Sequence, residues 1–317
     1  MRPLSRRRRK IADRLRPGIS EDQREKYLNA WEHEGFDVSP WRQPEKVQPP
    51  LEPIKVDVIV PFWENDLRLI VSTLEALLCQ KYVQPLIHVI SDGCKWPELP
   101  DGPFVKYETP GGWGPYKIAN AVFPGLKAEY VALNDGDDIS YPDRLWKQVQ
   151  RLKVSGAEIT CCSMVNKLVG ESNGCKDMTY WLGKSIPAKR VFDKHGPWGV
   201  LINGSRLMKR ELFNKVNGFK NENCGMDFQF DNRIQRLGVP TFFDNEVLMD
   251  RRMHSDSLSL GGTFQIGTSG RERTNKIVEN DAKVLASKNP CLTLVRSQGN
   301  LDTTKQLFPL SANRCYK

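Results

Sequence analysis

The sequence predicts an α/β protein with a mostly parallel central sheet flanked by helices. The first observation is that β-branched runs alternate, between residues 54 and 163, with segments whose apolar residues recur at helical spacing. The second is their order, because a strand, a helix and a further strand joined in sequence leave the two strands parallel. The third is an acidic cluster directly after one strand, since ligands of such sheets bind at the carboxyl ends of strands.

The composition is that of an ordinary globular protein. The chain has 317 residues, of which 39% are hydrophobic and 27% charged, and this excludes collagen-like, wholly disordered and disulfide-stapled classes. The formal net charge is +9, but residues 1–17 alone contain eight basic residues and one acid. Most of the positive charge therefore belongs to an N-terminal arm, and the rest of the chain is nearly neutral.

Nothing in the sequence indicates export or membrane insertion. No apolar run reaches the roughly 18–20 residues that span a bilayer, and no signal-peptide core follows the basic N-terminus. The eight cysteines include no Cys-x-x-Cys pair. We therefore expect a cytoplasmic protein with reduced thiols and no transmembrane segment.

Three parts follow one another along the chain. Residues 1–53 combine the basic arm, a short helix over 21–33 and a linker with five prolines between 39 and 53. The main domain is expected over 54–260, and a helical extension over 261–317.

Each element of the main domain has its own reason in the sequence. The runs at 55–61 and 85–91 are rich in Val and Ile, residues 66–80 place apolar residues on one helical face, and Pro142 suits a first helical turn. In chain order we expect strands at 55–61, 85–91, 104–107, 129–134 and 157–163, and helices at 66–80, 115–126, 142–152, 206–217, 227–237 and 273–288.

The acidic cluster is the sharpest local feature. Asn134-Asp135-Gly136-Asp137-Asp138 follows a buried-type strand and places three carboxylates in four residues. These charges repel one another, and a divalent cation that prefers hard oxygen ligands, Mg²⁺ or Mn²⁺, relieves the repulsion. On these residues alone, the position at a strand end favours a functional site, and a solvated acidic turn that caps the next helix is the alternative interpretation.

Two residues further along have both a structural and a functional interpretation. Asp227 lies in the first turn of a predicted helix, where the helix dipole alone favours an acid. His254 is a lone histidine, and such residues are structural more often than not. The neighbouring Arg251 and Arg252 can pair with phosphate, and this favours a functional role for His254.

Seven segments, taken together and in order, resemble the GT-A glycosyltransferases of the large family 2. They are VDVIVPFWEN (56–65), HVISDGC (88–94), GPYKIAN (114–120), YVALNDGDDISYPDRLWKQV (130–149), NGSRLMKRELFNKVNGF (203–219), GMDFQFDNRIQRLG (225–238) and RRMHSDSLS (251–259). Each segment is weak evidence alone, but ordered sets rarely match by chance.

The resemblance implies a GT-A, Rossmann-like fold and a metal-dependent, inverting transfer of sugar from a nucleotide-diphosphate donor, most simply a UDP-sugar. It implies Asp227 as the catalytic base, and Asp135, Asp137 and His254 as the ligands of Mn²⁺ or Mg²⁺. The donor-binding residues that it implies are Pro61, Trp63, Glu64, Asp92, Lys117, Asn120, Asp135 and Arg252. Some residues depart from the family pattern, because Met226, Glu64 and Ser91 stand where Glu, Asn and Asp are usual.

The acceptor stays open between alternatives. A glycan or glycolipid is the commonest family case, and residues 1–17 would then help the enzyme sit on an anionic membrane surface, the inner face of the membrane. A modified base in DNA is a second acceptor, as for some phage-type enzymes, with the arm on phosphates. A non-catalytic nucleic-acid-binding module is a third reading, and the acidic cluster argues against it. Trp181 and Trp198 flank a variable region where such enzymes admit the acceptor.

Overall fold

The computed structural model describes residues 29, 52–67, 69–168, 185–186, 201–222, 224–254, 257, 268–286 and 308–310. All of these except residue 29 belong to a unit that spans Glu52–Lys317. The predicted arm and linker, nearly all of the helix at 21–33, and Trp181 and Trp198 lie outside the described residues. Among the described helices, none is long and apolar enough to cross a membrane.

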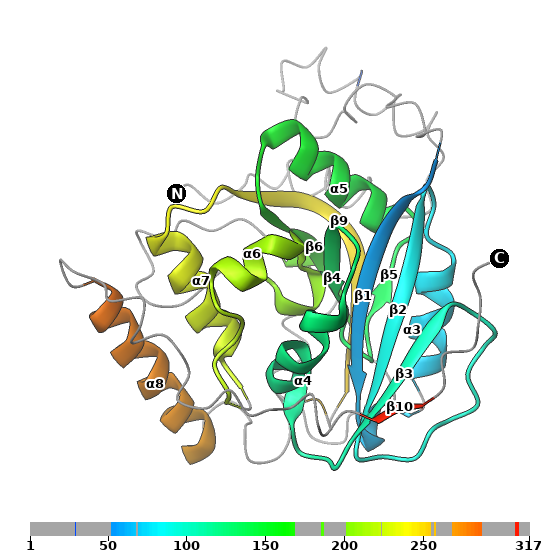
Figure 1. The fold of residues 1–317 in the computed structure, drawn as a ribbon, viewed down its shortest axis with the longest axis horizontal. Helices are drawn as coiled ribbons and strands as arrows, with labels where there is room; N and C mark the ends of the chain where they lie inside the picture. The colour runs from blue at the N-terminus through cyan, green and yellow to red at the C-terminus, as the bar shows by residue number, and fades with distance from the viewer. Residues whose placement is uncertain are drawn as a thin grey trace. The chain divides into compact units, whose positions relative to one another are not determined.

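A single sheet organises the described part of the chain (Figure 1). Its strands lie in the order β10-β3-β2-β1-β4-β8-β6-β9-β5, and β7 pairs with β6. The strand bounds are β1 Ile54–Phe62, β2 Val83–Asp92, β3 Phe104–Thr109, β4 Tyr130–Leu133, β5 Ile139–Ser140, β6 Ile159–Leu168, β7 Ser185–Ile186, β8 Leu207–Lys209, β9 Thr241–Met253 and β10 Phe308–Leu310. The central strands β3, β2, β1 and β4 are mutually parallel, β6 and β9 are parallel, and β8 is antiparallel to both β4 and β6.

Helices cover both faces of this sheet (Figure 1). Alternate residues of β1 point to opposite faces, so that Val58 packs with α3 and α5 whereas Ile59 packs with α4, α6 and α7. The helix α8 joins the second layer through Val278. The helix bounds are α3 Ile70–Leu78, α4 Gly114–Val122, α5 Arg144–Ser155, α6 Arg210–Lys215, α7 Met226–Arg236 and α8 Ser269–Ala286, with short 3-10 turns η1 Glu64–Asp66, η2 Phe123–Gly125 and η5 Asn203–Ser205.

The predicted α/β class with a mostly parallel central sheet is confirmed, and several strands differ from the prediction. The helix expected over 206–217 begins as the strand β8, because Leu207 and Met208 pair with β4 and β6 on either side. Pairing in the middle of a sheet outweighs local helix propensity here. The strands β5, β7, β9 and β10 have no counterpart in the prediction.

The parallel strands bring the chemistry to one edge of the sheet. The carboxyl ends of β1, β4, β6 and β9 point the same way, because β8 is antiparallel to both β4 and β6 and β9 is parallel to β6. The residues that follow β1, β4 and β9 therefore meet at this edge, as expected for open α/β sheets.

A buried polar group ties the first three strands together away from that edge. Asp57 of β1 accepts a hydrogen bond from His88 Nε2 of β2 at 3.1 Å, and Asp57 Oδ2 accepts the backbone N–H groups of Lys127 and Ala128, each at 2.8 Å. His88 Nδ1 lies 3.2 Å from the hydroxyl of Tyr107 on β3. Burial by itself would raise the pKa of Asp57, but the hydrogen bonds from His88 and the backbone lower it overall.

We predict that Asp57→Ala lowers the free energy of unfolding by about 3 kcal/mol, because the buried His88 imidazole and two backbone N–H groups lose their acceptor. Since the folded-state pKa of Asp57 is below its ordinary 3.8, its contribution is present above that pH and is lost as the pH falls further. Urea unfolding at a series of pH values measures both effects. The exposed Asp101→Asn is the matched control, expected within about 0.5 kcal/mol of the wild type.

Candidate active site

The acidic loop after β4 is shaped by a buried arginine. Arg144, at the start of α5, donates from Nη1 to Asn134 Oδ1 and Ser140 Oγ, each at 2.7 Å, and from Nη2 to the carbonyl of Leu133. Asn134 Nδ2 in turn donates to the carbonyl oxygens of Asp135 and Asp138. The loop therefore closes on itself around Asn134, and Arg144 fixes it from the buried side.

Two glycines let the loop fit closely against its neighbours. A Cβ atom on Gly136 would lie 2.7 Å from the carbonyl oxygen of Pro61, and one on Gly204 would lie 2.5 Å from Asp135 Oδ2. The predicted donor residue Pro61 thus contacts the loop through its backbone, at the end of β1. A side chain at either glycine would displace the acidic loop.

Arg252, at the end of β9, clamps the loop to the first turn of α3. Its guanidinium donates to the carbonyl of Asp137, to Ser72 Oγ at 2.6 Å, and to Leu69 O and Thr73 Oγ1 at 2.9 and 2.6 Å. Its backbone N–H donates to Asp138 Oδ1 at 3.0 Å. The predicted phosphate-binding Arg252 is therefore occupied with protein oxygens and holds the loop in place.

The carboxylates gathered at this edge perturb one another. Burial, reinforced by the negative charge of Asp137, raises the pKa of Asp135 to about 7. The same two causes raise the pKa of Asp66 to about 7, and burial places the pKa of Asp138 well above its usual range. The nearby positive charge of Arg251 opposes the shifts at Asp135 and Asp138. The edge thus carries more acid than its local cations neutralise.

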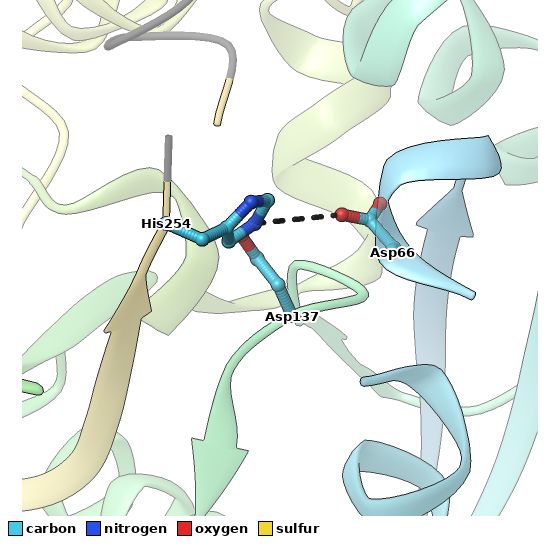
Figure 2. Close-up of side chains that lie close together, drawn as sticks. All are labelled: Asp66, Asp137 and His254. Carbon is cyan, nitrogen blue, oxygen red and sulfur yellow. Dashed lines mark hydrogen bonds and ion pairs between the residues drawn. The ribbon is translucent and has the colours of Figure 1, made fainter. Parts of the chain in front are cut away.

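Asp137 takes part in two groups of side chains that could hold a metal ion. Asp66, Asp137 and His254 form one group and Asp135, Asp137 and Asp138 the other, with the ligand atoms of each within 4.8 Å of one another. Figure 2 shows the first group, in which His254 Nε2 lies 3.1 Å from Asp137 Oδ2 and 3.9 Å from Asp66 Oδ1. The predicted metal ligands Asp135, Asp137 and His254 are thus divided between two groups that share Asp137.

Asp227, the predicted base, lies in the first turn of α7 and is partly exposed. The hydroxyl of Tyr116 on α4 donates to Asp227 Oδ1 at 2.9 Å. Burial raises the pKa of Tyr116, and the charge of Asp227 raises it further, so the hydroxyl stays protonated and remains the donor. Among the described residues, no hydrogen bond to Asp227 Oδ2 is present, which leaves this oxygen for another partner.

A narrow cavity lies beside these groups. It is lined by Ile59, Pro61, Pro115, Tyr116, Ala119, Leu133, Asn134, Asp135, Asn203 and Phe219. The cavity therefore extends from the end of β1 to the acidic loop and the start of α4, with Asp135 and Tyr116 both in its wall.

Two of the predicted donor residues organise loops in this structure. Asp92 accepts from Thr109 Oγ1 at 2.6 Å and from the backbone N–H groups of Trp113 and Gly114, and so fixes the turn that starts α4. The side chain of Asn120 exchanges hydrogen bonds with the backbone of Phe219, at 2.8 Å in both directions. Both side chains therefore have a positioning role, and direct contact with a nucleotide stays a prediction.

The remaining predicted donor residues border the same edge. Trp63 follows β1 and donates its backbone N–H to Asp66 Oδ2 at 3.2 Å, while Glu64 is exposed in η1. Lys117 is partly exposed on α4, one residue after Tyr116. They lie on the elements next to the cavity.

Sequence reasoning missed Asp66 and Tyr116. Asp66 has the sequence signature of an ordinary acid in the first turn after a strand, and Tyr116 that of an apolar position on a helix face. Neither pattern indicates the partner, because each contact joins residues that are far apart in the sequence. Asp66 contacts His254, and Tyr116 contacts Asp227. The available signal was that Asp66 directly follows the family-like segment 56–65 and that Tyr116 lies within the family-like segment 114–120.

The described residues thus combine a mostly parallel α/β sheet with an acidic loop and a histidine at the carboxyl ends of its strands. Residues 57–216 match the family described as Glycosyl transferase family 2. This segment is half of the chain, and the chain belongs to that family. No curated protein matches the sequence.

Two TarS structures share the fold at low sequence identity. TarS 1-349 of S. aureus in complex with UDP-GlcNAc has a TM-score of 0.51 and 13% identity, over 80% of this chain and 78% of that one. A second TarS structure has a TM-score of 0.50 and 13% identity over 74% of this chain, and the match spans only 40% of that protein. The mannosyltransferase PcManGT of Pyrobaculum calidifontis, in complex with GDP-Man and Mn²⁺, has 17% identity and a TM-score of 0.47 over 84% of this chain and 85% of that one.

We predict that Arg252→Lys lowers the free energy of unfolding by about 2 kcal/mol. A lysine ammonium donates from one point and cannot reach the separate oxygens that the guanidinium bridges. Urea unfolding measures the change. Arg251→Lys is the adjacent control and is expected to stay within about 0.5 kcal/mol of the wild type, because no hydrogen bond from its guanidinium is present among the described residues. Equal stability of both variants would contradict the clamp.

Proposed function

We propose that the protein is a metal-dependent, inverting glycosyltransferase that moves a sugar from a UDP-sugar to an acceptor hydroxyl, with Asp227 as the base. The observation that carries the proposal is the meeting of the acidic loop, His254 and Asp227 at one edge of the sheet. Asp135 lies close enough to Asp227 for its pKa to respond to that charge. Asp135 and Tyr116, the hydrogen-bond partner of Asp227, line the same cavity, which supports a shared space for the acidic loop and the base.

The residues present fit a divalent cation. Asp66 Oδ1 is buried and has no hydrogen-bond partner among the described residues, and it faces His254 beside Asp137. Carboxylate oxygens and one imidazole suit Mn²⁺, and oxygens suit Mg²⁺. Asp137 and His254 would hold the cation, which when bound supplies Lewis-acid stabilisation of the leaving diphosphate.

Arg251 can assist the same leaving group. It is partly exposed beside the acidic loop, and its charge acts on both Asp135 and Asp138. Its neighbour Arg252 is bound to protein oxygens, so Arg251 is the guanidinium that is free to meet phosphate oxygens. A bidentate contact there would orient the diphosphate.

Asp227 is suited to remove the acceptor proton. Tyr116 fixes Oδ1 by donating a hydrogen bond, and Oδ2 has no hydrogen bond among the described residues. A carboxylate held in this way can accept the hydroxyl proton while the acceptor oxygen attacks the anomeric carbon opposite the leaving diphosphate. Bond formation and departure on opposite faces invert the configuration at that carbon.

A glycan or glycolipid is the acceptor class that we propose. The identity of the donor sugar nucleotide is the first property to determine. The TarS structure that shares this fold contains UDP-GlcNAc, which supports UDP-sugars as the first donors to test. Residues 1–17 carry the chain's excess positive charge and would dock the enzyme on an anionic membrane surface. A modified DNA base is the alternative that the same charge allows.

We predict that a panel of nucleotide sugars with Mn²⁺ or Mg²⁺ identifies one donor whose nucleoside diphosphate is released. Asp227→Asn should lower transfer to the acceptor by roughly 10²–10⁴-fold while donor binding changes little, since only the base is removed. Product analysis over glycan, glycolipid and DNA acceptors measures transfer. Transfer only to DNA, lost when residues 1–17 are deleted, would replace the glycan proposal. Unchanged turnover in Asp227→Asn would exclude Asp227 as the base.

We also predict that Tyr116→Phe lowers kcat about tenfold, the loss that corresponds to one hydrogen bond to a charged group, and leaves the donor KM within about twofold. The ring stays in the core, so the fold should persist. Steady-state kinetics with saturating acceptor measures the split between kcat and KM. Tyr107→Phe also removes a buried hydroxyl contact, to His88, and is expected to leave kcat unchanged.

A further inference from the structure

We propose that Asp66 is a third protein ligand of the divalent cation, so that Asp66, Asp137 and His254 bind the cation without any nucleotide. The proposal rests on the proposed function in one respect, that the enzyme uses a metal ion. It goes further, because an ordinary magnesium site in such enzymes takes one or two carboxylates and relies on substrate phosphates.

The geometry of Asp66 supports this role. Asp66 ends η1, Asp137 lies in the loop between β4 and β5, and His254 follows β9, so three separate segments converge on one point (Figure 2). Asp66 is 3% exposed. Its Oδ2 accepts from Trp63 N, whereas Oδ1 points toward His254 at 3.9 Å. The dashed line in Figure 2 marks this approach.

A role as a local cap explains only one of the two oxygens. Oδ2 holds the turn after β1, as many acids at such positions do. Oδ1 is buried without a hydrogen-bond partner among the described residues, and a buried carboxylate oxygen in that state is costly. A cation between Asp66 and Asp137 removes both the missing interaction and the repulsion between the two carboxylates.

The second acidic group is already better compensated. Asp138 Oδ1 accepts the backbone N–H of Arg252, and the charges of Arg251 and Arg144 act on Asp135. The first group also contributes a nitrogen ligand, which the second lacks. Affinity for such mixed ligands rises from Mn²⁺ toward the later first-row metals, whereas Mg²⁺ prefers oxygen and keeps its waters. We therefore place the cation between Asp66, Asp137 and His254, with Mn²⁺ bound more tightly than Mg²⁺.

The test is a titration of the full-length wild-type chain with Mn²⁺ in the absence of nucleotide, followed by the loss of the electron paramagnetic resonance signal of free Mn²⁺. We expect one Mn²⁺ bound per chain, competed weakly by Mg²⁺. Asp66→Asn keeps an acceptor for the Trp63 amide and removes the charge, and should weaken Mn²⁺ binding at least about tenfold. If Asp66→Asn does not fold, Asp66→Ser, which also keeps an acceptor, is the second variant, and we expect it to show the same loss of Mn²⁺ affinity.

Two control variants separate the two acidic groups. Asp135→Asn should leave Mn²⁺ affinity within about threefold, and the partly exposed Asp143→Asn should leave it unchanged. Any of three results would overturn the proposal. They are wild-type Mn²⁺ affinity in Asp66→Asn, a large loss of affinity in Asp135→Asn instead, and Mn²⁺ binding only after UDP is added. Because these readouts need no turnover, Asp66-dependent Mn²⁺ binding without any donor turnover would disprove the proposed function and leave this inference standing.

Discussion

Electrostatic repulsion among four carboxylates is the constraint on which the rest of the site depends. Asp66, Asp135, Asp137 and Asp138 are brought to one edge of the sheet by strands whose carboxyl ends all point the same way. Burial and like charge together raise the pKa values of Asp66, Asp135 and Asp138. A fold that gathers acids in this way needs cations, and it obtains them from three arginines and, in our proposal, a metal ion.

The arginines have different tasks, although all three are close to the acids. Arg144 is buried and shapes the loop from inside through Asn134 and Ser140. Arg252 joins the loop to the first turn of α3. Arg251 lies near the acids and makes no hydrogen bond from its guanidinium among the described residues. Of the two adjacent arginines, Arg252 therefore stabilises the protein, and Arg251 is available to bind a ligand. This division follows from the alternation of side chains along β9.

The parts of the fold that sequence could predict were those with a local cause. Val58 and Ile59 face opposite helical layers, as alternation in a strand requires, and the acidic loop follows its strand directly. Leu207 was expected in a helix, and the strand was missed because its pairing partners, β4 and β6, are distant in sequence. Asp66 and Tyr116 escaped for the same reason, since their partners, His254 and Asp227, are set by topology and not by spacing.

The clamp made by Arg252 also has a consequence for the order in which the protein is made. Its partners Ser72 and Leu69 precede it by 180 and 183 residues. During synthesis from the N-terminus, the acidic loop emerges long before the strand that fastens it. The loop must therefore remain unsecured, with its charges exposed to one another, until β9 has been synthesised and added to the sheet. This edge of the sheet is therefore complete only after β9 has been added.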